Sequence, residues 1–197
     1  MQHSKLKMAA MLAAMLALAG CISLGSDTPD RLIMLTADQQ AKPGEFSSGA
    51  IGDAYVILDP DADRRLDVTR VPVTVDASTV VYLKDAVWVE KPARQFRRLL
   101  AETLRATSNR VVVEGADFEV SGGTFVSGRL SEMGYDAQIQ AVIVRYDAVV
   151  EGRDGAIRSR RFEAEVPVAQ ATADIVAPAL NEAANAVAKE VAEWLAG

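Results

Sequence analysis

The feature that most constrains the fold of this chain is a series of three long β-rich segments in its C-terminal half. We expect strands over residues 124–131, 137–150 and 157–168. The turn between the last two contains Asp154-Gly155, a pair typical of tight β-hairpins. Apolar residues of the middle strand fall on both alternating faces, which predicts a central position in the sheet. Such a meander disfavours a doubly wound parallel sheet.

Two segments have the periodicity of amphipathic α-helices. Over residues 91–108, Pro92 takes the first helical position, where proline is favoured. Apolar residues recur there at helical spacing: Phe96, Leu99, Leu100 and Leu104. A second helix follows Asp174, which we expect to cap it, and its apolar residues are spaced by four and three positions. These residues are Leu180, Ala184, Val187, Val191 and Trp194.

Shorter β-rich runs complete the expected domain. They cover residues 31–35, 54–58, 67–75, 79–83, 111–114 and 117–120. Pro72 indicates that its strand begins late or lies at an edge of the sheet, because proline cannot donate a ladder hydrogen bond. Trp88 and Trp194 adjoin apolar stripes, so we expect both to pack in the core. Together these elements predict an α+β fold, a two-layer sandwich of a mostly antiparallel sheet with two main helices.

The N-terminal residues have the order of a bacterial lipoprotein signal peptide. Lys5 and Lys7 precede an apolar run of about 11 residues, which is too short to span a bilayer. Small residues then lead into the only cysteine, in the run Leu18-Ala19-Gly20-Cys21. We expect cleavage between Gly20 and Cys21 and lipid attachment to Cys21. The alternative is a buried N-terminal helix with a core cysteine.

This signal divides the chain into three expected parts. Residues 1–20 are the signal peptide, residues 21–30 a lipidated tether and residues 31–197 a single periplasmic α+β domain. Ile22 stands where, in the enterobacterial sorting rule, an aspartate retains a lipoprotein in the inner membrane. We therefore expect the chain to be lipid-anchored at the periplasmic face of the outer membrane rather than at the inner membrane.

Charge and residue usage exclude several functions. Removing the leader with its two lysines changes the net charge from −6 to −8, which argues against nucleic acid as a partner. The only histidine, His3, lies in the leader, so the mature chain has no Ser-His or Cys-His pair and no typical zinc site. Gly122-Gly123 is too isolated for a phosphate loop. We expect no enzyme activity, no metal and no cofactor.

The sequence also contains two clusters of charged residues. Asp59, Asp61 and Asp63 have the alternating spacing of a calcium loop, but Arg64 stands at the position of the sharp-turn glycine and Arg70 at that of the bidentate glutamate. A solvated acidic turn is the expected structure. A basic cluster follows later in the chain: Arg158, Arg160 and Arg161. It predicts an edge strand protected by charge, with an acidic partner or lipid headgroups as the alternative.

Several motifs together carry a family resemblance. Residues 66–73 read Leu-Asp-Val-Thr-Arg-Val-Pro-Val, and residues 81–88 read Val-Tyr-Leu-Lys-Asp-Ala-Val-Trp. Arg161-Phe162-Glu163-Ala164 later leads to Val166-Pro167-Val168, and the last helix closes near Trp194. With the lipoprotein signal, this order resembles the ABC-type transport auxiliary lipoproteins, the family of the PqiC-like proteins. Tyr82-Leu83 is present, but the Pro-x-Tyr-Leu-Asp-Arg-Pro motif frequent in the PqiC branch is not.

The resemblance implies a small α/β sandwich without catalytic residues. It also implies partners: an MCE-domain periplasmic protein with its permease and ATPase, which together move lipids across the bacterial envelope. The chain would be a lipid-anchored accessory subunit with a docking or gating role, and a homo-oligomer is compatible with the family. One alternative is a periplasmic carrier that binds a phospholipid in an apolar groove between sheet and helices. Another is a cell-wall hydrolase that uses carboxylates.

Overall fold

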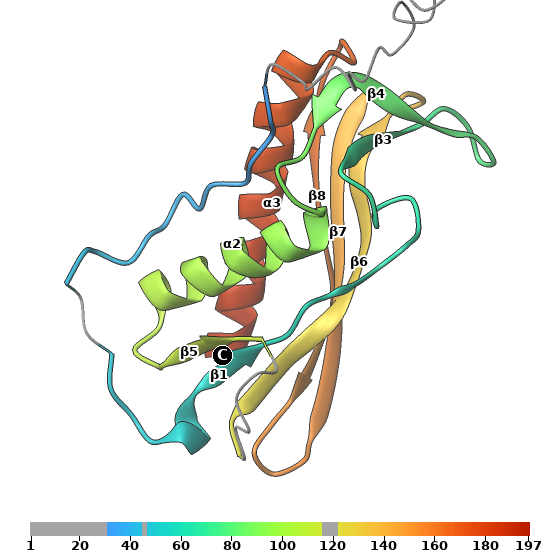
Figure 1. Cartoon of the computed structure of the whole chain (residues 1–197). Coiled ribbons are helices and arrows are strands. Elements are labelled where there is room, and N and C mark those ends of the chain that lie inside the picture. Colours follow the sequence, from blue (N-terminus) through green and yellow to red (C-terminus); the bar gives the residue numbers. More distant parts are fainter. Residues whose placement is uncertain (1–30, 45–46, 116–121) are drawn as a thin grey trace, which may run out of the picture. The chain divides into compact units, whose positions relative to one another are not determined.

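A computed structural model of the chain describes residues 31–44, 47–115 and 122–197 (Figure 1). The predicted leader and tether, and the strand expected over 117–120, lie outside the described residues. Among the described residues, the elements form one eight-stranded sheet and two α-helices, with a short 3-10 helix, η1 (Ile51–Asp53).

The centre of the sheet is the long strand β6 (Thr124–Asp136). Along one edge it pairs antiparallel with β7 (Ala141–Glu151) over its full length. Along the other edge it pairs in parallel with three short strands: β1 (Tyr55–Ile57), β2 (Asp61–Ala62) and β3 (Arg70–Thr74). The chain segment 55–74 therefore follows β6 from end to end, touching it at three separate places.

Three further strands extend the sheet. β8 (Ile157–Pro167) pairs antiparallel with β7, β4 (Val80–Val87) antiparallel with β3, and β5 (Val112–Glu114) in parallel with β1. The long ladders are antiparallel and the parallel pairings short, which confirms the expected mostly antiparallel sheet. β7 lies between β6 and β8, as predicted, and Gly155 adopts φ +76° in the predicted β7–β8 turn.

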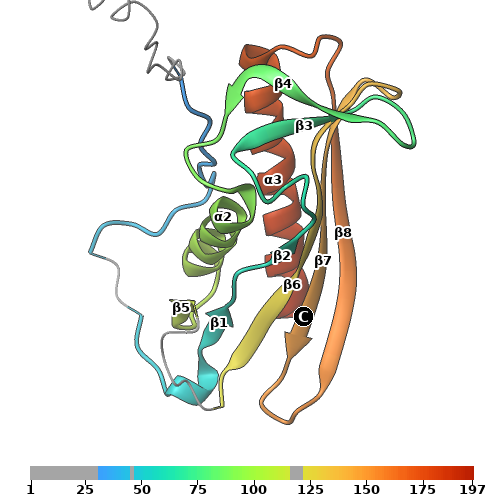
Figure 2. The same cartoon turned by 45° about the vertical axis from the view of Figure 1, so that its right-hand side comes forward.

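Two α-helices cover one face of the sheet: α2 (Pro92–Thr107) and α3 (Ala173–Ala196), as Figures 1 and 2 show. Their predicted apolar stripes are buried except for Trp194, which is partly buried, and Pro92 occupies the first turn of α2 as expected. Together with the sheet they form the predicted two-layer α+β sandwich. The expected cap was wrong: Thr172 is the N-cap of α3, and Asp174 lies inside its first turn.

The core lies between the helices and the sheet. Its largest fully buried side chains include Trp88, Phe96, Tyr146 and Phe162. The rings of Phe96 and Tyr146 meet with their centroids 5.0 Å apart, which joins α2 to β7. Trp88 is buried as predicted, whereas Trp194 is only partly buried and packs on Phe162 with centroids 5.6 Å apart.

The strand expected over 124–131 continues to Asp136, and the one expected over 137–150 begins only at Ala141. Two further strand predictions need correction. Residues 31–35 form no strand: a single bridge joins Ile33 to Trp88, and the side chains of Leu32 and Met34 are exposed. One bridge is too little pairing for a strand, and the N–H of Leu35 donates to the side chain of Gln95 in α2 instead of to a neighbouring strand. The strand expected over 67–75 begins late, at Arg70, as Pro72 suggested, but it lies between β4 and β6 rather than at an edge.

Candidate functional site

The predicted lipid-attachment site, Cys21 with the cleavage position at Gly20, lies outside the described residues, as does His3. Lipid attachment therefore stays a prediction from the sequence. In the part of the chain that the structure covers, no helix is long and apolar enough to cross a membrane.

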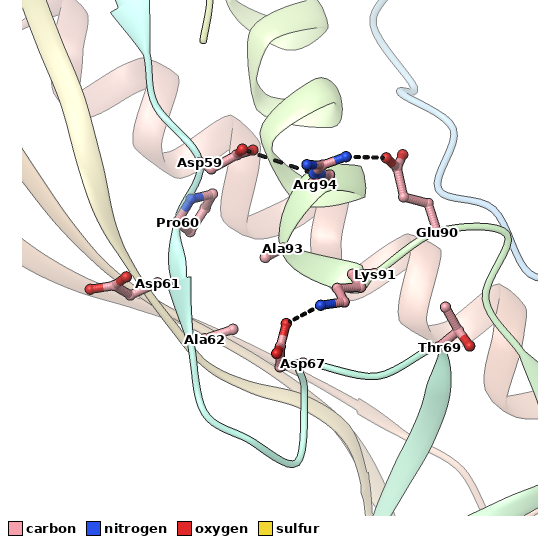
Figure 3. Close-up of a pocket in the computed structure, with 10 residues that line it drawn as sticks. All are labelled: Asp59, Pro60, Asp61, Ala62, Asp67, Thr69, Glu90, Lys91, Ala93 and Arg94. Carbon is pink, nitrogen blue, oxygen red and sulfur yellow. Dashed lines mark hydrogen bonds and ion pairs between the residues drawn. The ribbon is translucent and has the colours of Figure 1, made fainter. Parts of the chain in front are cut away.

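A polar cleft of about 630 Å³ opens beside the N-terminus of α2 (Figure 3). We call it the α2 cleft. It is lined by Asp59, Pro60, Asp61, Ala62, Asp67, Thr69, Glu90, Lys91, Ala93 and Arg94. The acidic turn of the sequence forms one wall and the start of α2 forms the other (Figure 3). With four carboxylates against two cations, the lining favours a cationic group over an anionic one.

Most charges in the α2 cleft already have partners. Lys91 Nζ lies 2.7 Å from Asp67 Oδ1, and Arg94 Nη1 lies 3.5 Å from Glu90 Oε1. Asp59 is held by Arg97 from α2 at 2.9 Å. These pairs fix the wall of the cleft to the helix. They are partly exposed, so each contributes little to stability.

The three aspartates of the calcium-like spacing do not converge. Asp59 pairs with Arg97, Asp63 pairs with Arg129, and Asp61 points away from α2 (Figure 3). Among the described residues, no group of three or more potential ligands is placed to hold a metal ion. The acidic turn is thus an ion-paired surface element.

The face of the sheet opposite the helices carries two rows of charges that cross its strands. We call it the charged outer face. The first row is Asp63, Arg129, Asp147 and Arg161; the second is Arg65, Glu132, Arg145 and Glu163. Each row alternates in sign, so the eight groups sum to zero charge. The face thus offers a pattern of both signs rather than a basic or an acidic patch.

The register of β6, β7 and β8 creates these rows. Asp147 on β7 stands opposite Arg129 on one side and Arg161 on the other. Two hydrogen bonds, Arg161 Nε to Oδ1 at 2.5 Å and Nη2 to Oδ2 at 3.0 Å, make the Arg161–Asp147 pair bidentate. In the second row, Arg145 on β7 contacts Glu132 on β6 and Glu163 on β8. Opposite charges facing each other across strands stabilise the ladder.

In the first row, two groups have pKa values shifted by their ion-pair partners. The hydrogen bond from Arg161 lowers the pKa of Asp147, and Asp63 raises the pKa of Arg129. A carboxyl with a lowered pKa is unprotonated at neutral pH and cannot serve as a general acid. At neutral pH Asp147 is therefore a carboxylate, and its negative charge is paired with Arg161.

The predicted basic cluster is divided between two faces, because neighbouring residues of a strand point in opposite directions. Arg158 lies over the ring of Trp194 and Arg160 over that of Phe162, at 5.2 and 4.9 Å from the ring centroids. Arg161 lies on the other side, against Asp147. β8 is an edge strand protected by charge, as predicted, but its arginines do not form one patch.

A polar strap that the sequence did not predict holds residues 33–41 to the helices. The backbone N–H of Leu35 donates to Gln95 Oε1 at 2.9 Å, and that of Asp38 donates to Asn185 Oδ1 at 2.8 Å. Gln95 and Asn185 are 4 and 8 % exposed. Two polar residues on the buried faces of amphipathic helices were the available signal, because such groups need hydrogen-bond partners. The strap fixes where the chain enters the domain.

Comparison with known proteins agrees with this architecture. Residues 35–192 match the family described as "ABC-type transport auxiliary lipoprotein component", so the chain belongs to this family. Its members are auxiliary components of transport systems and membrane-associated lipoproteins. Among the curated proteins, no relative matches the chain.

Solved structures share the fold at low sequence identity. Protein XCC0632 from Xanthomonas campestris, a member of DUF330, is 16% identical, with a TM-score of 0.70 over 84% of this chain and 94% of that one. An uncharacterized protein is 13% identical, with a TM-score of 0.63 over 76% of this chain and 96% of that one. The sandwich of two helices on a mostly antiparallel sheet is therefore an established fold.

Proposed function

We propose that this chain is a lipid-anchored accessory subunit of an MCE-type ABC transport system that moves lipids across the bacterial envelope. The observation that carries the proposal is the family match over residues 35–192, which places the domain among auxiliary components of ABC transporters. In this role the chain docks on, or gates, an MCE-domain periplasmic protein that works with a permease and an ATPase. It catalyses no reaction itself.

The lipid anchor in this proposal is Cys21, exposed by cleavage after Gly20. Burial of acyl chains gains about 0.8 kcal/mol per CH₂, so the two or three chains of a mature lipoprotein hold it firmly in a bilayer. Ile22 favours the periplasmic face of the outer membrane over the inner membrane. From there the domain would meet the outer-membrane end of the MCE assembly.

We assign docking to the charged outer face. No helix of the described residues covers it, and its paired charges of both signs favour a partner with a complementary pattern over a generally basic or acidic surface. The opposite face of the sheet is covered by α2 and α3, whose apolar stripes are used by the core. Because the apolar faces of the helices are buried, we expect the partner to contact strands and loops.

The alternative is a carrier that holds a phospholipid between sheet and helices. Trp88, Phe96, Tyr146 and Phe162 fill that space with their own side chains. A lipid could enter only if these side chains moved apart, which costs well-packed core contacts. We therefore rank the carrier second; stoichiometric phospholipid extracted from the purified chain would reverse this order.

Affinity purification of the tagged full-length protein from mildly solubilised membranes, followed by mass spectrometry, tests the proposal. We expect an MCE protein with its permease and ATPase to copurify. Arg161→Glu should reduce their recovery several-fold because it breaks the pair with Asp147. Arg153→Glu is the matched control, since Arg153 is similarly exposed (59 against 64 % of the side chain) but lies in the β7–β8 turn. Recovery of no transport component with lipidated wild type would refute the proposal.

A further inference from the structure

A group of apolar side chains is exposed where the chain enters the domain. Leu32, Met34 and Val89 are 52, 64 and 50 % exposed. We call these three residues the entry patch. Segment 31–35 lies at the end of the domain where α3 begins in both views (Figures 1 and 2).

The bridge between Ile33 and Trp88 explains why these side chains face outward. Ile33 N–H donates to Val87 O at 2.7 Å, and Val89 N–H donates to Ile33 O at 2.9 Å. In such an extended pair, successive side chains point to opposite sides. Ile33 and Trp88 point into the core, which leaves Leu32, Met34 and Val89 on the outside.

The entry patch is held in place. Besides the bridge, the hydrogen bond from Leu35 N–H to Gln95 fixes the segment to α2, and that from Thr36 N–H to Asn181 fixes it to α3. Its apolar side chains are therefore presented from a fixed backbone. Holding apolar side chains in water is unfavourable, and exposed clusters of them indicate an interaction site.

We propose that the entry patch inserts into the surface of the bilayer that holds the lipid anchor, so that this end of the domain rests on the membrane. The inference rests on lipid attachment at Cys21. Ten residue steps join Cys21 to Arg31, and an extended chain spans at most about 3.6 Å per residue, so Leu32 lies within about 40 Å of the lipidated sulfur. The lipid on Cys21 thus keeps the bilayer within reach of the entry patch, and no other binding partner is tethered to the chain in this way.

The composition of the entry segment fits the interface of a membrane. Arg31-Leu32-Ile33-Met34-Leu35 has one cation and no carboxylate, and two of its four apolar residues, Leu32 and Met34, face outward. An arginine beside apolar residues can keep its charge at the headgroups while they enter the acyl boundary. The chain as a whole is acidic, with a net charge of −6, so its contact with phospholipid depends on the apolar side chains. Moderate salt should therefore change it little.

A fluorescent reporter tests the inference on the full-length, lipidated protein. Because the lipid occupies the thiol of Cys21, a single introduced cysteine can be labelled with an environment-sensitive dye. We choose Met34→Cys in the entry patch and, as control, Ile157→Cys at the start of β8; Met34 and Ile157 are 64 and 69 % exposed. Each protein is reconstituted into phosphatidylethanolamine–phosphatidylglycerol vesicles containing a lipid with a quencher on its acyl chain.

We expect the dye at position 34 to be blue-shifted and quenched several-fold more strongly than the dye at position 157. Equal, weak quenching at both positions would overturn the inference and leave the accessory-subunit proposal intact. A second result would also overturn it. If the dye at position 34 is already shielded in detergent, if this shielding depends on protein concentration, and if the quencher lipid has no effect, then a second copy of the chain covers the patch. A mass spectrum without acyl chains on Cys21 would instead remove the anchor on which both proposals rest.

Discussion

The ring of Tyr146 lies directly against the α-carbon of Gly128 on the neighbouring strand. A Cβ at position 128 would be 2.9 Å from both Cζ and Oη of this ring and would also clash with the carbonyl oxygen of Asp147. The Tyr146 hydroxyl donates to the carbonyl oxygen of Ser127 at 2.7 Å, which holds the ring across the glycine. Gly128 also has φ +151°, a conformation that other residues rarely adopt.

Gly128→Ala should therefore destabilise the domain by about 3 kcal/mol, through steric overlap and backbone strain. Urea unfolding monitored by circular dichroism measures the change. Gly155→Ala is the matched control: φ is +76° there, but a Cβ at position 155 would have no atom within 4 Å, so about 1 kcal/mol is expected. If both variants lost the same free energy of unfolding, Tyr146 would not restrict the space at position 128.

Burial raises the pKa of Tyr146 above its ordinary value of 10.0. Above about pH 10 the unfolded chain releases this proton while the folded chain keeps it, so the free energy of unfolding falls as pH rises. Tyr146→Phe should lose about 1 kcal/mol at pH 7 with the hydrogen bond, yet show a shallower decline above pH 10. If the free energies of unfolding of wild type and Tyr146→Phe fell in parallel above pH 10, the raised pKa of Tyr146 would be contradicted.

The Asp147–Arg161 pair predicts the opposite pH response. The pKa of Asp147 lies below its ordinary 3.8, chiefly through the hydrogen bond from Arg161, so its stabilising effect is present above about pH 4 and is lost as pH falls further. Because Arg161 is largely exposed, Arg161→Gln should change the free energy of unfolding at pH 7 only slightly. Carbon-detected NMR titration should show the pKa of Asp147 rising in this variant. Arg153→Gln, which alters a pair with Asp53, should leave it unchanged.

Lipid attachment has its own test. In wild type, mass spectrometry should find an N-terminal peptide that begins at Cys21 and carries acyl chains. Cys21→Ala should accumulate as the uncleaved chain with residues 1–20 still present, whereas Ile22→Val should be processed normally. A wild-type peptide with a free Cys21 thiol would disprove the predicted signal.

The sequence was informative wherever structure depends on neighbours along the chain. The apolar spacing of Leu180, Ala184 and Val187 predicted α3, Pro92 predicted the start of α2, and Asp154-Gly155 predicted the β7–β8 turn. Helix periodicity and turn geometry are local properties, so a single sequence carries them. These elements were enough to predict the two-layer α+β sandwich.

Tertiary structure decided what depends on pairing between distant segments. No local signal indicates that β1, β2 and β3 share one edge of β6, or that residues 31–35 form one bridge instead of a strand. The charged outer face has the same origin: Arg129, Asp147 and Arg161 are far apart in sequence and meet only through strand register. The predicted lipid attachment at Cys21 is the reverse case, because a signal peptidase recognises a leader by its linear sequence. The sequence alone thus predicts the anchor, whereas only the folded sheet presents the surfaces beside it.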